Sequence, residues 1–369
     1  MRRWIAFLLL PAWLGSSDAA AQRVGEATEM YAGAEFRSLS FEGLQSVRRL
    51  QQTVFPVGLI VPLRRFRIDL GSAFVSTELL RVDSSHHRVT HLTDAQLRGS
   101  YMFGRDAVVA TLALNLPTGP HNAAPRDYAV VGAVSPSFLG FPVAAYSAGF
   151  SATGGVATAI AVGDWSLGMA GSLRISSRFT PYEDVTGPIT YKPGLEGRVR
   201  GGADGLLGAA RVSLGLTYST FGDDQFGGNG NARSGQYHPG PRWLAEAAMI
   251  APIGSSSLGL SVWSFRRTAG DTTGTSADNR ENLTSADLSL SIPMGTAVVL
   301  EPGVSGRISK PQAGRARMIG VGAALRIRLN RVLSLAPTAR YDSGWVEDSL
   351  GTRNALQGGY GSVFLRAAF

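Results

Sequence analysis

The chain has 369 residues, no cysteine, and a formal net charge of +8 from 35 Lys and Arg against 27 Asp and Glu. The lack of cysteine excludes a disulfide framework, a thiolate metal site and a thiol nucleophile. Nearly all the basic residues are arginines dispersed along the chain, with lysine only at Lys192 and Lys310, and this dispersion argues against a nucleic-acid-binding patch.

The chain opens with the features of an export signal. Arg2 and Arg3 form a basic start, residues 4–14 are apolar, and Ala19–Ala21 provide small residues for cleavage. The apolar stretch is too short for a membrane-spanning helix, which needs ~20 residues, and no later segment approaches that length. We therefore expect a cleaved signal peptide over residues 1–21, followed by one folded unit over residues 22–369.

Beyond the signal, hydrophobic and polar residues alternate along many short segments. In residues 165–179, Leu167 and Met169 fall on one face, while Ser166 and Arg174 fall on the other. A period of two indicates β-strands with two different environments. Because the alternation alone also suits a soluble sandwich, it predicts an all-β fold without giving its location.

Short turns and longer polar loops follow each other in turn along the chain, a rhythm typical of transmembrane β-barrels. We predict about sixteen strands, with fourteen or eighteen as alternatives. Short turns are expected at Pro62–Arg65, Gly104–Asp106, Gly163–Asp164, Ala203–Gly205, Ile253–Ser256, Met294–Gly295 and Asn330–Arg331. Long loops are expected at Glu42–Leu50, Leu79–Thr90, Gly119–Pro142, Pro181–Ile189, Phe221–Pro239, Ala269–Glu281, Lys310–Gly314 and Gly344–Ala355.

A Leu-Pro-Thr-Gly motif ends the strand predicted before the longest loop. This motif, Asn115–Gly119, together with Thr93–Tyr101 and Gly154–Ala157, resembles poorly characterised outer-membrane barrels associated with phenol and hydrocarbon degradation pathways. The resemblance implies passage of small, often hydrophobic or aromatic, molecules, and it transfers no functional residue. The loop Gly119–Pro142 has apolar content between Val130 and Phe141, so we expect it to fold into the pore.

The last ten residues, Tyr360–Phe369, alternate and end on an aromatic side chain. A closing strand with a terminal Phe resembles the signal by which bacterial outer-membrane β-barrels are recognised for assembly. The resemblance implies a location in the bacterial outer membrane, contact with outer-membrane lipid, and the barrel-assembly machinery as a partner that recognises Phe369. Association into a homo-oligomer is left open.

The polar faces of the predicted strands give a lumen rich in arginine. One hypothesis is a mild anion preference, since a pore lined by one sign of charge enriches the opposite ion. The alternative is that these charges pair across neighbouring strands and solvate the interior. The expected lumen-lining residues are Arg67, Arg98, Arg174, Arg178, Arg198, Arg200, Arg211, Arg307, Arg326, Arg328, Arg340, Arg366, Glu196 and Glu301.

The expected function is therefore an outer-membrane channel for passive passage of small solutes, with no cofactor and no catalytic residue. The alternatives are a structural or adhesin-like barrel that transports nothing, and an outer-membrane hydrolase. A hydrolase would use residues such as Asp223, Asp224 and His238 in one predicted loop, but a second acidic pair is missing from the sequence.

A metal site is the remaining chemical possibility in the sequence. His86, His87 and His91 with Asp83 have suitable ligand chemistry. All five histidines fall in predicted loops, where solvated side chains are the simpler interpretation, so we expect no metal.

Overall fold

The computed structural model describes residues 27–44, 46–104, 108–120, 124, 127–184, 187–228, 235–272, 280–310, 314–348 and 350–369. The expected signal peptide over residues 1–21 lies outside these residues. Within the described ranges, no helix is long and apolar enough to cross a membrane.

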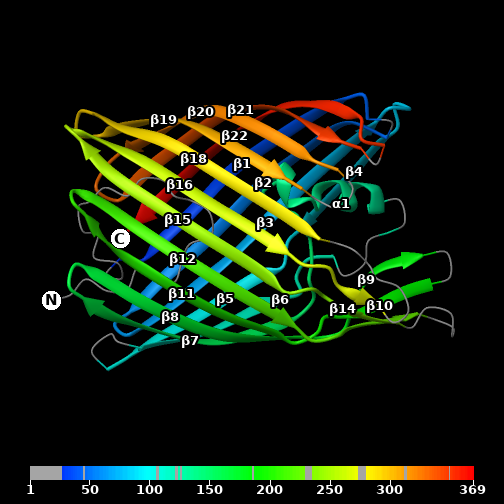
Figure 1. Cartoon of the computed structure of the whole chain (residues 1–369), viewed down its shortest axis with the longest axis horizontal. Helices are drawn as coiled ribbons and strands as arrows, with labels where there is room; N and C mark the ends of the chain where they lie inside the picture. The colour runs from blue at the N-terminus through cyan, green and yellow to red at the C-terminus, as the bar shows by residue number, and fades with distance from the viewer. Residues whose placement is uncertain are drawn as a thin grey trace.

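The architecture is a closed antiparallel β-barrel with strongly tilted strands (Figure 1). Its sheet has 17 strands, but β4 and β5 are successive pieces of one wall position, because both pair with β3. The described wall therefore has 17 − 1 = 16 positions, which confirms the predicted number. The wall strands are β1 (Glu29–Glu42), β2 (Val47–Leu63), β3 (Phe66–Arg81), β4 (His86–Leu92), β5 (Ala95–Phe103), β6 (Val108–Leu116), β7 (Ser151–Val162), β8 (Trp165–Ser176), β11 (Glu196–Leu207), β12 (Ala210–Phe221), β15 (Arg242–Ile253), β16 (Ser256–Arg267), β18 (Glu281–Met294), β19 (Val298–Ser309), β20 (Ala316–Arg328), β21 (Leu333–Glu347) and β22 (Arg353–Ala368).

The barrel closes where β1 pairs with β22. The two strands are in antiparallel register from Glu29 opposite Ala368 to Glu42 opposite Ala355. The Thr28 amide donates to the Phe369 carbonyl at 2.8 Å, and the Phe369 amide donates to the Thr28 carbonyl at 3.0 Å. The pairing thus extends to the last residue of the chain.

The outer face of the barrel is apolar. In β8, Met169, Leu173 and Ile175 are 66%, 59% and 60% exposed, whereas Ser166, on the opposite face of the same strand, is 3% exposed. The two faces follow the predicted alternation, and similar exposed apolar residues occur around the wall. A closed barrel with an apolar exterior is the form in which strands cross a membrane, because closure satisfies every backbone group. The chain therefore has the form of a transmembrane β-barrel.

The short turns lie where predicted in most hairpins, and one prediction is wrong. Ala203–Gly205 belongs to β11, and the turn to β12 lies at Gly208, where φ is +61°. The strand continues because Asp204 accepts a hydrogen bond from Arg211 across the hairpin at 2.7 Å. Gly205 serves a packing role instead, since an added Cβ there would overlap the ring of Trp165. Part of the predicted Gly104–Asp106 turn lies outside the described residues.

Several predicted long loops contain regular structure. Residues 79–90 mostly continue the wall, so His86, His87 and His91 lie in β4 rather than in a loop. His238 lies in a second, five-stranded sheet at the barrel end that also holds the helices (Figure 1). That sheet comprises β9 (Phe179–Asp184), β10 (Gly187–Lys192), β13 (Asp224–Gly228), β14 (Gly235–His238) and β17 (Asp271–Thr272), and the helices are α1 (Tyr128–Val134) and the 3-10 helix η2 (Ser137–Leu139).

We predict that Gly358→Ala destabilises the closing seam. An added Cβ at Gly358 would overlap the carbonyl oxygen of Ser38 on β1, so the seam must shift. Overpacking of this kind costs about 1–3 kcal/mol. The urea midpoint of the barrel in detergent, followed by tryptophan fluorescence, measures the loss.

The matched control is Gly306→Ala in β19, where an added Cβ meets nothing within 4 Å. Its midpoint is expected to stay at that of the unchanged protein. Equal midpoints for the two variants would show that the seam tolerates a side chain at Gly358.

Candidate functional site

The inward face of the wall carries nearly all the arginines that were expected to line the lumen. Their positions follow from strand alternation, since the residues next to them point outward. Arg178 differs: it follows β8, outside any wall strand, and its Nη2 donates to Gln225 of the second sheet at 3.2 Å. On the inward face lie Arg67 (β3), Arg98 (β5), Arg174 (β8), Glu196, Arg198 and Arg200 (β11), Arg211 (β12), Glu301 and Arg307 (β19), Arg326 and Arg328 (β20), Arg340 (β21) and Arg366 (β22).

Most of these arginines form ion pairs with acids of the same or a neighbouring strand. This favours the alternative that pairing is a main role of the lumen charges. The pairing is incomplete, because Glu196 serves two arginines and Asp342 serves two others. The pairs with the shortest N–O distances are Arg67–Asp69 (2.6 Å), Arg198–Glu196 (2.6 Å), Arg200–Glu246 (2.5 Å), Arg211–Asp204 (2.7 Å), Arg326–Glu301 (2.6 Å) and Arg366–Glu29 (2.5 Å).

The described part of the connection between β6 and β7, residues 117–120, 124 and 127–150, folds into the barrel, and we call it the inner loop. It contains α1 and η2, and its side chains Val130, Val134 and Phe138 are buried. They belong to one apolar cluster with wall residues such as Leu39 and Val75. Within Gly119–Pro142, the described residues fold inward as predicted, residues 121–123 and 125–126 lie outside them, and the short helices were not predicted.

The tip of the inner loop is held by a buried arginine. Arg37 of β1 is fully buried, and its Nε donates to the Leu139 carbonyl at 2.7 Å. Its Nη1 donates to Asp342 of β21 at 2.8 Å, and the Phe141 ring lies 5.8 Å from the guanidinium. A buried charge is tolerated only with such partners. Gly140, between the two loop residues, has φ of +63°, and an added Cβ there would overlap the Arg307 guanidinium, which would have to move.

The middle of the inner loop is held by a side-chain amide. Gln52 of β2 donates to the Val143 carbonyl and accepts from the Val143 amide, both at 2.9 Å. The same Nε2 donates to Thr77 of β3 at 3.0 Å, and the Tyr146 hydroxyl donates to Thr77 as well. Gln52 pairs with the loop backbone as a neighbouring strand would.

Both ends of the inner loop meet at Asp94, between β4 and β5. Its carboxylate accepts from the Gly119 amide at 3.0 Å and from the Ala148 amide at 2.9 Å. Asn115 of β6 donates to the same carboxylate at 2.7 Å and to the Gly149 carbonyl at 2.7 Å. Asp94 therefore fixes where the loop leaves the wall and where it returns.

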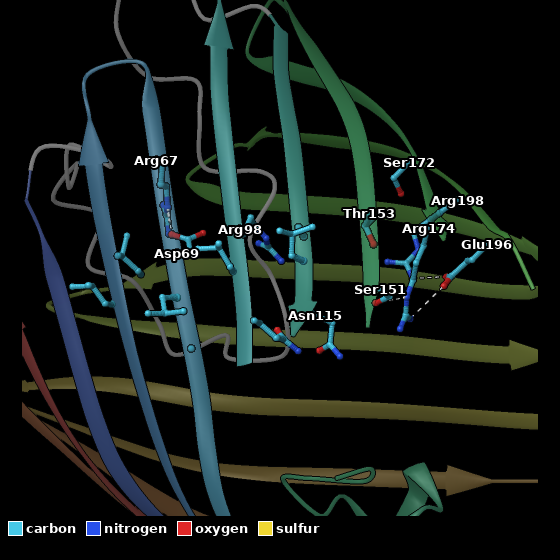
Figure 2. Close-up of a pocket in the computed structure, with 18 of the residues that line it drawn as sticks. Arg67, Asp69, Arg98, Asn115, Ser151, Thr153, Ser172, Arg174, Glu196 and Arg198 are labelled. Carbon is cyan, nitrogen blue, oxygen red and sulfur yellow. Dashed lines mark hydrogen bonds and ion pairs between the residues drawn. The ribbon is translucent and has the colours of Figure 1, made fainter. Parts of the chain in front are cut away.

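A cavity of about 510 Å³ lies along the inner wall beside the base of the loop. Charged side chains gather in two places on its lining, with Asn115 between them in the view of Figure 2. One group is Arg67, Asp69 and Arg98 on β3 and β5; the other is Arg174, Glu196 and Arg198 on β8 and β11. This arrangement can hold charged or strongly polar solutes.

Sequence reasoning did not identify Arg37, Gln52 or Asp94 as anchors of the inner loop. Their partners lie 102, 91 and 25 residues away along the chain. The sequence signal that was available is a polar residue at an inward position of a strand beside apolar inward neighbours, as with Gln52 between Leu50 and Val54.

Among the described residues, the other candidate chemistry is not assembled into a site. Asp224 accepts from the Tyr191 hydroxyl at 2.6 Å and from the Gly194 amide at 2.7 Å, so it stabilises the second sheet. Its neighbour Asp223 pairs with His238 at 2.8 Å, and both side chains are exposed. Within the described ranges, no group of three or more His, Asp or Glu is arranged to hold a metal ion.

Comparison with known proteins finds distant structural matches and no close relative. No family model and no curated protein matches the chain. The OmpT outer membrane protein of Vibrio cholerae matches with a TM-score of 0.44 and 9% identity, over 93% of this chain and 97% of that one. The CymD monoaromatic hydrocarbon channel gives 0.44 and 10%, over 94% and 90%. A deletion mutant of the TodX monoaromatic hydrocarbon channel gives 0.48 and 10%, over 94% and 91%.

We predict that Arg37→Met lowers the free energy of unfolding of the barrel more than the same substitution at a half-exposed lumen arginine. Breaking a buried ion pair costs about 3–5 kcal/mol. We expect a loss of about 3 kcal/mol, the lower end of this range, because Asp342 would still form its ion pair with Arg340 at 3.0 Å. The urea midpoint in detergent measures the loss.

The control is Arg366→Met, whose pair with Glu29 is 48% and 28% exposed. Exposed pairs contribute about 0–1 kcal/mol, so its midpoint should hardly move. Equal shifts in the two variants would contradict the role of Arg37 as an anchor.

Proposed function

We propose that this barrel is a non-enzymatic channel for passive passage of small solutes, in which the inner loop sets the width of the path. The observation that carries the proposal is the 510 Å³ cavity, which adjoins the loop base and has charged and hydroxyl side chains as well as apolar ones in its lining. Barrels of 16 to 18 strands are wide enough to leave an aqueous channel. The charged and hydroxyl side chains can form hydrogen bonds with a hydrated solute, which the apolar outer face of the barrel cannot.

We propose further that the path prefers anions. Arginines outnumber acids among the charged residues that line the cavity, and shared acids leave part of this charge uncompensated. An excess of positive charge along low-dielectric walls enriches anions in the path. Small hydrophobic or aromatic compounds are the alternative solutes, suggested by the resemblance of residues 93–101 and 115–119.

A second candidate is a barrel whose lumen is permanently closed and whose role is structural. The observation that favours it is the density of contacts that hold the inner loop, at Arg37, at Gln52 and at Asp94. A loop held at its tip, middle and ends has little freedom to leave the lumen.

Single-channel conductance in a planar bilayer distinguishes the two candidates. We predict a steady current through the unchanged protein, and a reversal potential under a salt gradient that reports anion preference. Replacing residues 128–141 with a short Gly-Ser linker removes the tip of the inner loop and should raise the conductance severalfold. A non-selective current would contradict the proposed anion preference and would support a channel.

The control for that variant is the same replacement of residues 179–192 in the second sheet, which should leave the conductance unchanged. Current only in the loop-shortened variant would indicate a barrel closed by the inner loop. No current in either protein would contradict the channel and support a structural barrel.

We also propose that Phe369 is read by the barrel-assembly machinery. Its side chain is 65% exposed at the closing seam, where a partner can reach it. Phe369→Ser should lower the amount of folded barrel in the outer membrane severalfold, measured by heat-modifiable mobility on gels, without changing the urea midpoint of protein refolded in detergent. An unchanged amount would contradict the role.

Cross-linking of the refolded protein tests for a homo-oligomer.

A further inference from the structure

We propose that the lumen cavity is a binding site for a dicarboxylate, with one carboxylate held by each of its two charged groups. The inference rests on the proposed channel function and names the solute class that this part of the path would take. The observation behind it is the separation of the lining charges into two groups, and the net charge alone would not support it.

The first group is Arg67, Asp69 and Arg98, and it has one positive charge in excess, 2 − 1 = +1. Arg67 Nε lies 2.6 Å from Asp69 Oδ1, so that carboxylate is already engaged. Arg98 lies directly opposite Asp69 in the sheet register but makes no hydrogen bond or ion pair with any described residue. Its guanidinium is therefore available to a solute. Figure 2 shows Arg98 on the side of the cavity that also carries Arg67 and Asp69.

The second group is Arg174, Glu196 and Arg198, again with an excess of 2 − 1 = +1. Glu196 Oε1 lies 2.6 Å from Arg198 Nη2, and its Oε2 lies 3.8 Å from Arg174 Nη1. Glu196 is only 10% exposed, whereas Arg198 and Arg174 are 53% and 37% exposed. The acid is thus covered by the arginines, and the arginines face the cavity.

Neutral polar side chains separate the two groups. Asn115, Ser151, Thr153 and Ser172 line the cavity on β6, β7 and β8. The strands that carry Arg98 and Arg174 are three positions apart, which places their backbones about 14 Å apart at the ~4.8 Å spacing of neighbouring strands. Long arginine side chains shorten this gap from both sides.

A dicarboxylate matches this layout because its two charges are separated by a neutral chain. Arginine binds carboxylate through paired N–H donors, which makes each group a suitable end point. A monocarboxylate can use only one group, and an anion with both charges on one centre, such as sulfate, cannot reach both. The cavity volume is within the range of small-molecule sites, ~300–1,000 Å³.

Isothermal titration of the full-length refolded protein in detergent tests the inference with three probes: adipate, hexanoate and sulfate. Adipate and hexanoate have the same number of carbons and differ in one carboxylate. We expect adipate to bind at least tenfold more tightly than hexanoate or sulfate. Equal affinities, or no binding of adipate, would overturn the inference.

Variants then test whether both groups take part. Arg98→Gln and Arg198→Gln should each lower the affinity for adipate about tenfold, to the level of hexanoate, while leaving hexanoate within about twofold. Arg331→Gln, in an exposed turn between β20 and β21, removes the same charge and should change neither affinity. An equal loss in Arg331→Gln would mean that net charge alone attracts the anion, which also overturns the inference.

Failure of this inference is distinguishable from failure of the channel. Ionic current without adipate binding would leave the channel and remove the dicarboxylate site. Adipate binding without current would keep the site in a barrel that does not conduct. Heat-modifiable mobility of each variant on unboiled gels shows that the compared proteins are folded.

Discussion

Backbone hydrogen bonding in lipid is the constraint on which the rest of this structure depends. An unpaired amide or carbonyl in the hydrocarbon costs several kcal/mol, so a sheet that crosses the membrane must have no free edge. Here the pairing of β1 with β22 removes the last edge, down to the reciprocal bonds between Thr28 and Phe369. Closure in turn assigns each side chain to lipid or lumen, which is why Leu173 faces out and its neighbour Arg174 faces in.

Enclosure also explains how the interior is organised. Charges that cannot face lipid are concentrated in the lumen, where they must find partners or water. At the end that holds the helices, apolar residues of the wall pack against α1 and η2. Among them, Arg37 and Gln52 divide their hydrogen bonds between the inner loop and other wall residues. Along the wall beside the loop base, the charges surround a cavity instead and retain exposure. The lumen is thus divided into an occupied part and an accessible part.

The sequence predicts the parts of this fold that arise from local periodicity. Alternation assigns the two faces of β8, and turn residues mark most hairpins, because both depend on neighbours in the chain. Ala203–Gly205 has the composition of a turn but lies in β11, since Asp204 gains a partner across the hairpin. The sequence placed His86, His87 and His91 in a loop. The prediction failed because β4 pairs with residues 74–80 of β3 and extends the wall beyond the expected height.

The organisation of the candidate site was less predictable for the same reason. The arginines on inward faces follow from alternation, but which of them share an acid depends on strand register, which the sequence does not specify without the structure. The anchors of the inner loop depend on contacts between residues far apart in the chain, so the role of Asp94 could not be recognised from its place in the sequence.

The contact of Arg37 with both Leu139 and Asp342 constrains the order of folding. It joins three segments that are 102 and 305 residues apart, from the first wall strand, the inner loop and the penultimate strand. Contacts of such large sequence separation form late, because the chain between them must first be ordered. We therefore expect the Arg37 contacts at the tip of the inner loop to form only after β21 has joined the wall. The contacts at Gln52 and Asp94 join residues closer in sequence, so the middle and ends of the loop can be placed before its tip.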